Sequence, residues 1–162
     1  MRNERRHLFV VIMAGLMSLA INAQTPADSV AADFTMLTRG GDTLRLSQLP
    51  TDRLTLLIFY DPDCADCRQE LFAMRHSSQL RRAVRAGRVQ VLCVYAEQND
   101  TLWRATSDEF PTAWMVAKTV TDVKGLGLYD LSGMPSLYLL DKSKAIIQQD
   151  YEFSELRERL PQ

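Results

Sequence analysis

The chain has 162 residues, of which 46% are hydrophobic and 24% are charged, and its formal net charge at pH 7 is −1. This size and composition predict one globular domain that needs neither a metal nor a disulfide simply to fold. The sequence shows no basic patch with interleaved aromatic residues, so nucleic acid is not expected as a partner.

The N-terminus has the three parts of a secretory signal peptide. Arginines near the start are followed by an uncharged apolar run at residues 8–21 and by the small residue Ala23. We therefore expect residues 1–23 to be a cleaved signal peptide and residues 24–162 to be the domain, exported to the periplasm or cell envelope. An uncleaved membrane anchor is the alternative, although the apolar run is shorter than the ~18 to 20 residues that a spanning helix prefers.

Two strand patterns precede the first helix. Residues 32–49 are predicted to form two short strands around the Gly-Gly pair at 40–41, which tolerates the positive φ of a hairpin turn. Residues 54–60 are a continuous apolar run, which is typical of a central strand covered on both faces. The Asp-Pro-Asp sequence at 61–63 is expected to end that strand.

A helical pattern starts at a Cys-x-x-Cys motif and runs to Gly87, which is expected to stop it. Its basic part, residues 75–88, has apolar residues at helical spacing and is interpreted as the solvated face of an amphipathic helix. Residues 89–97 indicate a second buried strand, and residues 100–110 a short helix with Asp100 as its N-cap.

The C-terminal part continues the alternation of strands and helices. Residues 111–118 are interpreted as a short strand, and residues 121–131 as a weak helix interrupted by two glycines. Residues 136–141 and 145–150 are predicted to form a pair of strands, followed by an amphipathic helix over 153–160. This order predicts an α/β sandwich.

The Cys-x-x-Cys motif consists of Cys64 and Cys67, between the predicted central strand and the helix. At the first turn of a helix, unpaired N–H groups and the helix dipole stabilise an anion, so Cys64 is the candidate attacking thiolate. Cys67, one turn further on, is placed to attack a mixed disulfide formed at Cys64. The pair is therefore predicted to be redox-active.

The cysteines allow other interpretations. A structural zinc site needs four ligands, and only Cys93 and His76 remain as further Cys or His ligands in residues 24–162, so no metal is expected. An inert disulfide closing so small a loop would add little stability. Cys93 lies in an apolar strand, where a small buried hydrophobe is the usual role and a regulatory thiol is the alternative.

Carboxylates surround the motif. Glu70 lies three residues after Cys67 on the same helical face and is a candidate proton carrier, with an ordinary solvated glutamate as the alternative. Asp63 and Asp66 oppose the helix dipole and disfavour a thiolate, unless Arg68 offsets one of them. The inference is a comparatively reducing cysteine pair.

A second element of interest is Met134-Pro135, which directly precedes a predicted strand, at a place where a cis peptide can form a sharp entry. In that form the loop would set the Met134 backbone beside the cysteines, free to pair with an extended substrate chain. The alternative is a trans proline that opens an edge strand. The sequence leaves the isomer open.

With these motifs the chain resembles the thioredoxin-fold proteins, and among them the TlpA/ResA-type exported thiol–disulfide oxidoreductases. The resemblance covers residues 32–160 and rests on the phrases DFTMLTRGGDTLRLSQL, LLIFYDPDCADCRQE and GMPSLYLLD. It implies a thioredoxin-like three-layer sandwich with a central mixed sheet and an N-terminal β-hairpin addition. It also implies that Cys64 is the nucleophile, Cys67 the resolving thiol, Pro135 a cis-proline and Glu70 the active-site acid.

The chain also departs from the family pattern. Family members commonly have tryptophan at the positions of Tyr60 and Asp63 and proline at that of Asp66, so the redox potential and partner surface are expected to differ here. A peroxiredoxin, the neighbouring family, would need threonine or serine at Asp61 and proline at Leu57. That interpretation is therefore rejected.

The leading hypothesis is an envelope protein-disulfide reductase in which Cys64 attacks, Cys67 resolves, and Met134 and Asp63 contact the client. No cofactor is expected, because the cysteines themselves carry the two electrons. Protein thiol or disulfide clients, a membrane electron-delivery partner and a monomeric state are expected. The alternatives are a disulfide oxidase or isomerase, and a non-catalytic binding module that kept the fold.

Overall fold

The computed structural model describes residues 29–97 and 99–162, so the predicted signal peptide, residues 1–23, lies outside the described residues. The described residues form a seven-stranded sheet in the order β2-β1-β5-β4-β3-β6-β7. The strands are β1 (Thr35–Thr38), β2 (Thr43–Arg45), β3 (Leu54–Tyr60), β4 (Val89–Tyr95), β5 (Met115–Thr119), β6 (Ser136–Leu140) and β7 (Ile146–Asp150).

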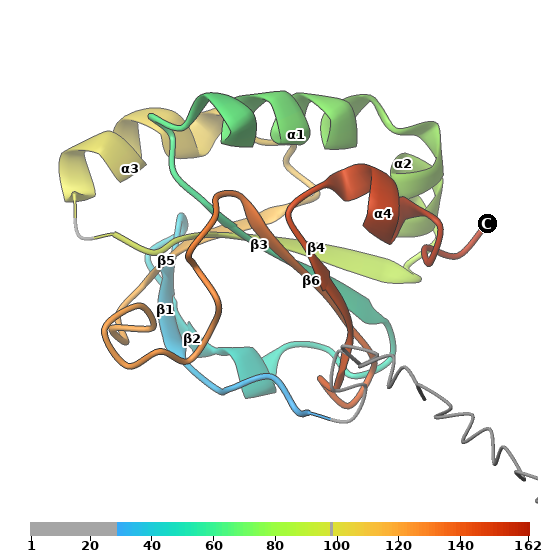
Figure 1. The fold of residues 1–162 in the computed structure, drawn as a ribbon, viewed down its shortest axis with the longest axis horizontal. Helices are drawn as coiled ribbons and strands as arrows, with labels where there is room; N and C mark the ends of the chain where they lie inside the picture. Colours follow the sequence, from blue (N-terminus) through green and yellow to red (C-terminus); the bar gives the residue numbers. More distant parts are fainter. Residues whose placement is uncertain (1–28, 98) are drawn as a thin grey trace, which may run out of the picture.

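Four α-helices pack on the same face of this sheet, the upper face in Figure 1. The helices are α1 (Ala65–His76), α2 (Ser78–Arg85), α3 (Asp100–Thr106) and α4 (Phe153–Arg157), with short 3-10 helices η1 (Leu46–Gln48) and η2 (Ser107–Glu109). Across the described ranges, no helix has both the length and the apolar character needed to cross a membrane.

The sheet is mixed, as the sequence predicts. Strand β3 pairs in parallel with β4 and antiparallel with β6, and β4 pairs in parallel with β5. The predicted N-terminal hairpin is present as well, because β1 pairs with β2 across the turn at residues 40–41 and then joins β5. The predicted C-terminal strand pair is β6 and β7, which are antiparallel.

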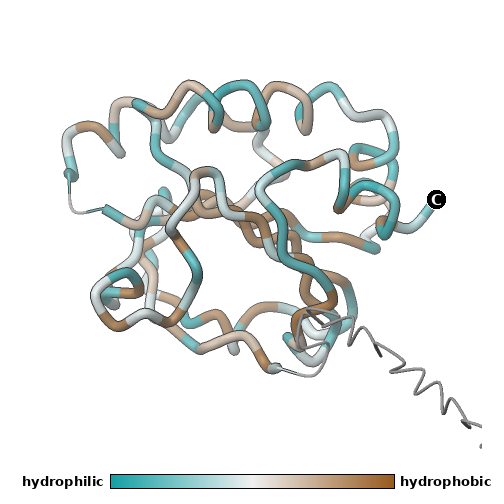
Figure 2. The backbone as a smooth tube through the Cα atoms, viewed as in Figure 1, coloured by the Kyte–Doolittle hydropathy of each residue, from teal (hydrophilic) through white to brown (hydrophobic). Residues whose placement is uncertain are grey.

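Strand β3 is covered on both faces. Leu56 and Ile58 lie in the core beneath the helices, whereas Leu57 and Phe59 lie in a second core on the opposite face, and all four are 0% exposed. Figure 2 shows the apolar residues concentrated in the strands and polar residues on the outer helical surface. The continuous apolar run is therefore explained by burial on both sides.

The second face is covered by the short 3-10 helix η1 and by irregular chain, so the third layer of the sandwich contains no α-helix among the described residues. The helix predicted over residues 121–131 does not form. The Asp122 carboxylate accepts a hydrogen bond from the Gly125 N–H at 2.8 Å, and Gly127 has a φ of +60°, a conformation that ends a helix. Val123 and Tyr129 of this segment are instead buried against the sheet as a turn-rich cover.

Several helix boundaries also differ from the prediction, since α3 ends at Thr106 and α4 at Arg157, before the expected residues 110 and 160. The helix expected to run from the cysteines to Gly87 is divided at Ser77, whose hydroxyl caps α2 by accepting from the Leu80 N–H at 3.2 Å. Helix α3 is capped by Asn99 rather than by Asp100, because the Asn99 side chain accepts from the Leu102 N–H at 3.1 Å. Gly87 ends α2 with a φ of +67°, as expected.

The topology brings two distant segments together at one end of β3. Phe59 pairs with Ser136, the first residue of β6, so the chain leaving β3 and the chain entering β6 meet at the same edge of the sheet. The first of these segments carries Cys64 and the second carries Pro135. This juxtaposition positions the candidate site.

Truncation of the central strand tests this architecture. We expect Leu57→Ala to lower the free energy of unfolding by about 2 to 5 kcal/mol, because it leaves a cavity at a fully buried position. Leu126→Ala is the matched control, since Leu126 is 65% exposed, and its expected change is within about 0.5 kcal/mol. Urea unfolding of both variants measures the difference. Equal losses would contradict the two-sided burial of β3.

Candidate active site

Cys64 occupies the N-cap position of α1. Its sulfur accepts a hydrogen bond from the Cys67 backbone N–H at 3.1 Å, so the thiol takes the place that a Ser or Asp oxygen usually has in a helix cap. The side chain is half-buried and open to solvent on one side. A partial positive charge at the helix end and an accessible sulfur are what an attacking thiolate requires.

Cys67 has a different environment, because it lies on the inner face of α1 and is fully buried. Burial, followed by the hydrogen bond and charge of the neighbouring Cys64, raises the pKa of the Cys67 thiol well above its ordinary value. Cys67 is therefore a protonated thiol at neutral pH. The geometry separates an accessible sulfur from a buried one within a single helical turn, as attacking and resolving roles require.

The loop before β6 closes over the cysteine pair. The Met134–Pro135 peptide bond is cis, and the Cys64 thiol lies 3.5 Å from the Met134 carbonyl oxygen as a hydrogen-bond donor. Pro135 is buried and Met134 is half-buried at the surface. The backbone of Met134 thus lies directly beside the reactive sulfur, in the arrangement expected for the cis isomer.

Glu70 is half-buried, and its carboxylate accepts a hydrogen bond from the Phe153 backbone N–H at 2.8 Å. This contact fixes α1 to the first residue of α4 and gives Glu70 a structural role that the sequence pattern did not indicate. Glu70 also lines a cavity of about 250 Å³ beside the proline loop. The lining residues are Asp66, Gln69, Glu70, Met134, Pro135, Tyr151 and Glu152.

The charged residues around Cys64 are arranged without direct ion pairs. The Asp61 carboxylate accepts from the Asp63 N–H at 2.9 Å and so shapes the turn before the cysteine. Arg68 donates to the Pro62 carbonyl at 2.9 Å, and no salt bridge joins it to Asp63 or Asp66 in the described part of the chain. Both aspartates are exposed, so the rim of the site is acidic.

Cys93 is 0% exposed in β4 and lies in the same core as Cys67. Burial raises the pKa of the Cys93 thiol far above its ordinary value. The prediction of a small buried hydrophobe is therefore confirmed for its environment. Such a thiol is inert unless the core opens.

Sequence reasoning missed the side chains that hold the proline loop. Asp130 accepts hydrogen bonds from Ser132 in the same loop and from Tyr151, which follows β7. The Asp-x-Ser spacing is a recognisable turn signal, because a short carboxylate readily accepts from the N–H two residues on. Tyr151 carries no such local signal.

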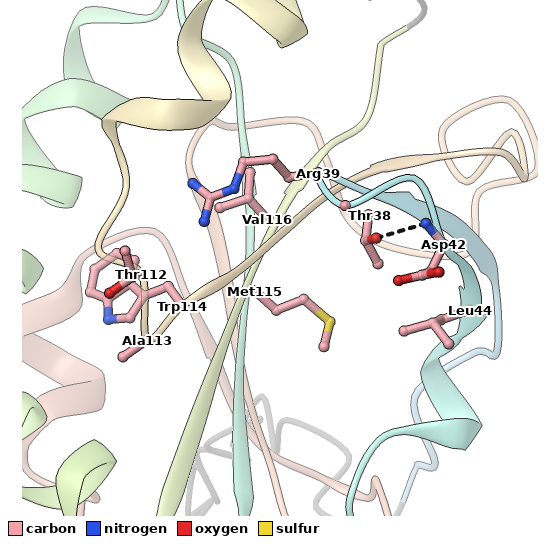
Figure 3. Close-up of a pocket in the computed structure, with 10 residues that line it drawn as sticks. Thr38, Arg39, Asp42, Leu44, Thr112, Ala113, Trp114, Met115 and Val116 are labelled. Atoms are coloured by element: carbon pink, nitrogen blue, oxygen red, sulfur yellow. Dashed lines mark hydrogen bonds between the residues drawn. The ribbon is translucent and has the colours of Figure 1, made fainter.

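A cavity of about 380 Å³ lies away from the cysteines, between the hairpin turn and the start of β5. Figure 3 shows the Trp114 and Asp42 side chains on opposite sides, with Arg39 and Met115 between them. Residues predicted from the sequence as catalytic or client-binding do not line it. Glu70, Met134 and Pro135 line the smaller cavity beside the proline loop instead, and the cysteines line neither cavity.

Comparison with known proteins places this site in a family. Residues 27–149 match the model of the AhpC/TSA family, and no curated protein matches the chain. A conserved protein of unknown function from Bacteroides fragilis is similar, with 34% identity and a TM-score of 0.77 over 82% of this chain and 97% of that chain.

Two further solved structures are similar. A thioredoxin-like protein from Bacteroides caccae has 27% identity and a TM-score of 0.77 over 83% of this chain, but the match covers only 48% of that longer chain. The thioredoxin domain of a thiol-disulfide oxidoreductase from Bacteroides vulgatus has a TM-score of 0.69 over 83% of this chain and 98% of that domain. Its identity is 18%, so this likeness concerns the fold alone.

The family match spans most of the chain, and the fold is the thioredoxin-like α/β fold that the sequence predicts. This chain has Asp61 in the turn before Cys64 and Leu57 in the buried strand. A peroxiredoxin would need threonine or serine at the first position and proline at the second. The chain therefore belongs to the AhpC/TSA family and has a thioredoxin-like fold.

Proposed function

We propose that this protein is a protein-disulfide reductase of the cell envelope that works through Cys64 and Cys67. The observation that carries the proposal is the position of the Cys64 sulfur. It caps α1, accepts the Cys67 N–H at 3.1 Å and lies 3.5 Å from the Met134 carbonyl. An activated sulfur beside an open stretch of backbone suits attack on a disulfide in an extended chain.

The reaction has two steps in this proposal. The Cys64 thiolate attacks one sulfur of the client disulfide, the client S–S bond breaks, and one client sulfur leaves as a thiolate that takes up a proton. Cys67 then loses its proton and attacks the Cys64 sulfur. The mixed disulfide breaks, the second client thiol is released, and the two electrons have passed from the dithiol to the client.

The remaining predicted site residues have supporting roles. Glu70 receives the proton that Cys67 must lose, because a buried thiol needs a base to become nucleophilic. The Met134 backbone pairs with the client, and Pro135 holds that backbone beside the sulfur. Asp63 is exposed at the rim of the site, where it contacts the client surface.

The acidic rim supports the reducing direction. Negative charge near the sulfur destabilises its thiolate, and a dithiol whose thiolate is less stable passes its electrons to a client disulfide more readily. The signal-peptide pattern supports export, and a reductase working in an oxidising compartment needs electrons from a membrane donor. We propose that the protein acts as a monomer and needs no bound cofactor.

The redox potential is the first test. Purified protein expressed from the full chain is equilibrated in thiol/disulfide buffers, and alkylated cysteines are counted by mass. We expect Cys64 and Cys67 to titrate together near or below about −270 mV, the value typical of thioredoxin. A value near about −120 mV would replace the reductase with an oxidase or isomerase. Exchange only after unfolding would instead favour the binding module.

A trapping experiment tests the roles of the two cysteines. We expect Cys67→Ser to accumulate mixed disulfides between Cys64 and client proteins, because the resolving thiol is gone. Cys64→Ser is the matched control and is expected to trap no clients, since Cys67 is buried. Reducing and non-reducing electrophoresis of whole-cell extracts measures the adducts. Equal trapping by both variants would refute the assignment of Cys64 as the nucleophile.

The role of Glu70 is tested by Glu70→Gln, whose amide oxygen can still accept the Phe153 N–H. We expect resolution of a preformed Cys64 mixed disulfide to slow by about 100-fold near neutral pH, because the base is lost. The rate should recover as pH rises, since the high pKa of Cys67 makes its deprotonation limiting. Glu155→Gln, at an exposed position of α4, is the control. An unchanged rate and pH profile would leave Glu70 with only its structural contact.

A further inference from the structure

The segment from the last residue of β7 to the first residue of α4, residues 150–153, contacts both the loop that carries Pro135 and the helix that carries the cysteines. At one end of it, Tyr151 contacts the loop that carries Met134 and Pro135. At the other end, the Phe153 N–H donates to Glu70 of α1 at 2.8 Å. The same connection lines the 250 Å³ cavity between these two contacts.

The contact at Tyr151 is built around the Asp130 carboxylate. One carboxylate oxygen accepts from the Ser132 N–H at 3.0 Å and from the Ser132 hydroxyl at 2.6 Å, and the other accepts from the Tyr151 hydroxyl at 2.8 Å. These hydrogen bonds lower the pKa of Asp130 to about 2, Ser132 contributing most. Asp130 is therefore charged at neutral pH, and hydrogen bonds to a charged acceptor are stronger than those between neutral groups.

The Tyr151 ring makes a second contact with the same loop. It lies so close to Gly133 that a Cβ atom at that position would come within 2.9 Å of the ring. The absence of a side chain at Gly133 therefore allows the ring to lie against the backbone of the residue before Met134. Tyr151 therefore contacts the loop at two places, with its hydroxyl at Asp130 and with its ring at Gly133.

The loop held in this way presents the backbone that faces the reactive sulfur. Met134 follows Gly133 directly, and its carbonyl oxygen is the atom 3.5 Å from the Cys64 sulfur. Tyr151 itself makes no hydrogen bond with either cysteine in the described residues. Its influence on the site is exerted through the loop.

We propose that Tyr151 is a positioning residue of the redox site, which holds residues 130–134 so that the Met134 backbone is ready to pair with a client chain. This inference rests on the proposed function. It assigns Tyr151 to client recognition and leaves the sulfur chemistry to the cysteines. Loss of the hydroxyl is therefore expected to weaken reactions with peptide disulfides and to spare reactions with small disulfides that have no backbone to pair.

Tyr151→Phe tests the proposal in the full chain, because it removes the hydroxyl and keeps the ring against Gly133. The first probe is a short unstructured peptide whose cysteine carries glutathione in disulfide linkage, and the second is hydroxyethyl disulfide. We expect KM for the peptide to rise about tenfold, the factor that corresponds to one hydrogen bond to a charged group, with kcat unchanged. The rate with hydroxyethyl disulfide should not change.

Tyr129→Phe is the matched control, because it removes another tyrosine hydroxyl bond, to the Ala32 carbonyl at 2.5 Å, without touching the Asp130 network. It is expected to lower stability and leave KM for the peptide unchanged. Equal KM values for Tyr151→Phe and the unmodified protein would overturn the proposal, as would parallel losses with both disulfide probes.

A second pair of variants checks the ring contact. Gly133→Ala is expected to raise KM for the peptide, because its Cβ pushes the loop away from the Tyr151 ring. In a Tyr151→Ala background the same change should add little, since the ring is absent. Fully additive effects would contradict the contact. If the unmodified protein reduces neither probe, the proposed function fails, whereas an active protein with an unmoved KM in Tyr151→Phe rejects this inference alone.

Discussion

The candidate site depends on the burial of β3 on both faces of the sheet. Alternate side chains of this strand lie in two separate cores, so the strand cannot shift its register by one residue without exchanging the two sets. Its last residue is Tyr60, and Cys64 follows after a single turn. Because β6 pairs with β3 at the same end, the position of Pro135 is fixed by the same strand. The precision of the site therefore comes from the core beneath it.

The two cysteines meet opposite conditions within one turn of α1. Cys64 lies at the helix cap, where backbone N–H groups favour negative charge on the sulfur. Cys67 lies on the buried face of the same helix, where burial raises the pKa of its thiol and keeps it protonated. One turn of α1 therefore holds one accessible thiol and one buried thiol. Asp63 and Asp66 are exposed at the rim beside Cys64, and the Asp61 carboxylate shapes the turn before it.

The contacts around the site also show how a small domain holds helix α1 and the proline loop in place relative to each other. Glu70 joins α1 to α4, and Tyr151 joins the proline loop to the end of β7. Both contacts involve the same short segment, residues 150–153, which runs from the last residue of β7 to the first residue of α4. The cavity between α1 and the proline loop is consequently framed by elements that are hydrogen-bonded to this segment.

Much of this arrangement follows from the sequence alone. The apolar runs at 54–60 and 89–97 determined the central strands, and the Cys-x-x-Cys motif between strand and helix determined the candidate thiols, because periodicity and helix ends are local properties. The irregular cover at 121–131, the cis isomer at Pro135 and the partner of Glu70 were decided by the tertiary structure. Glu70 and Phe153 are 83 positions apart, so no local pattern encodes their hydrogen bond. The sequence by itself determined which residues are candidates for the chemistry, and packing decided what holds them in place, because such contacts form only once distant elements share one core.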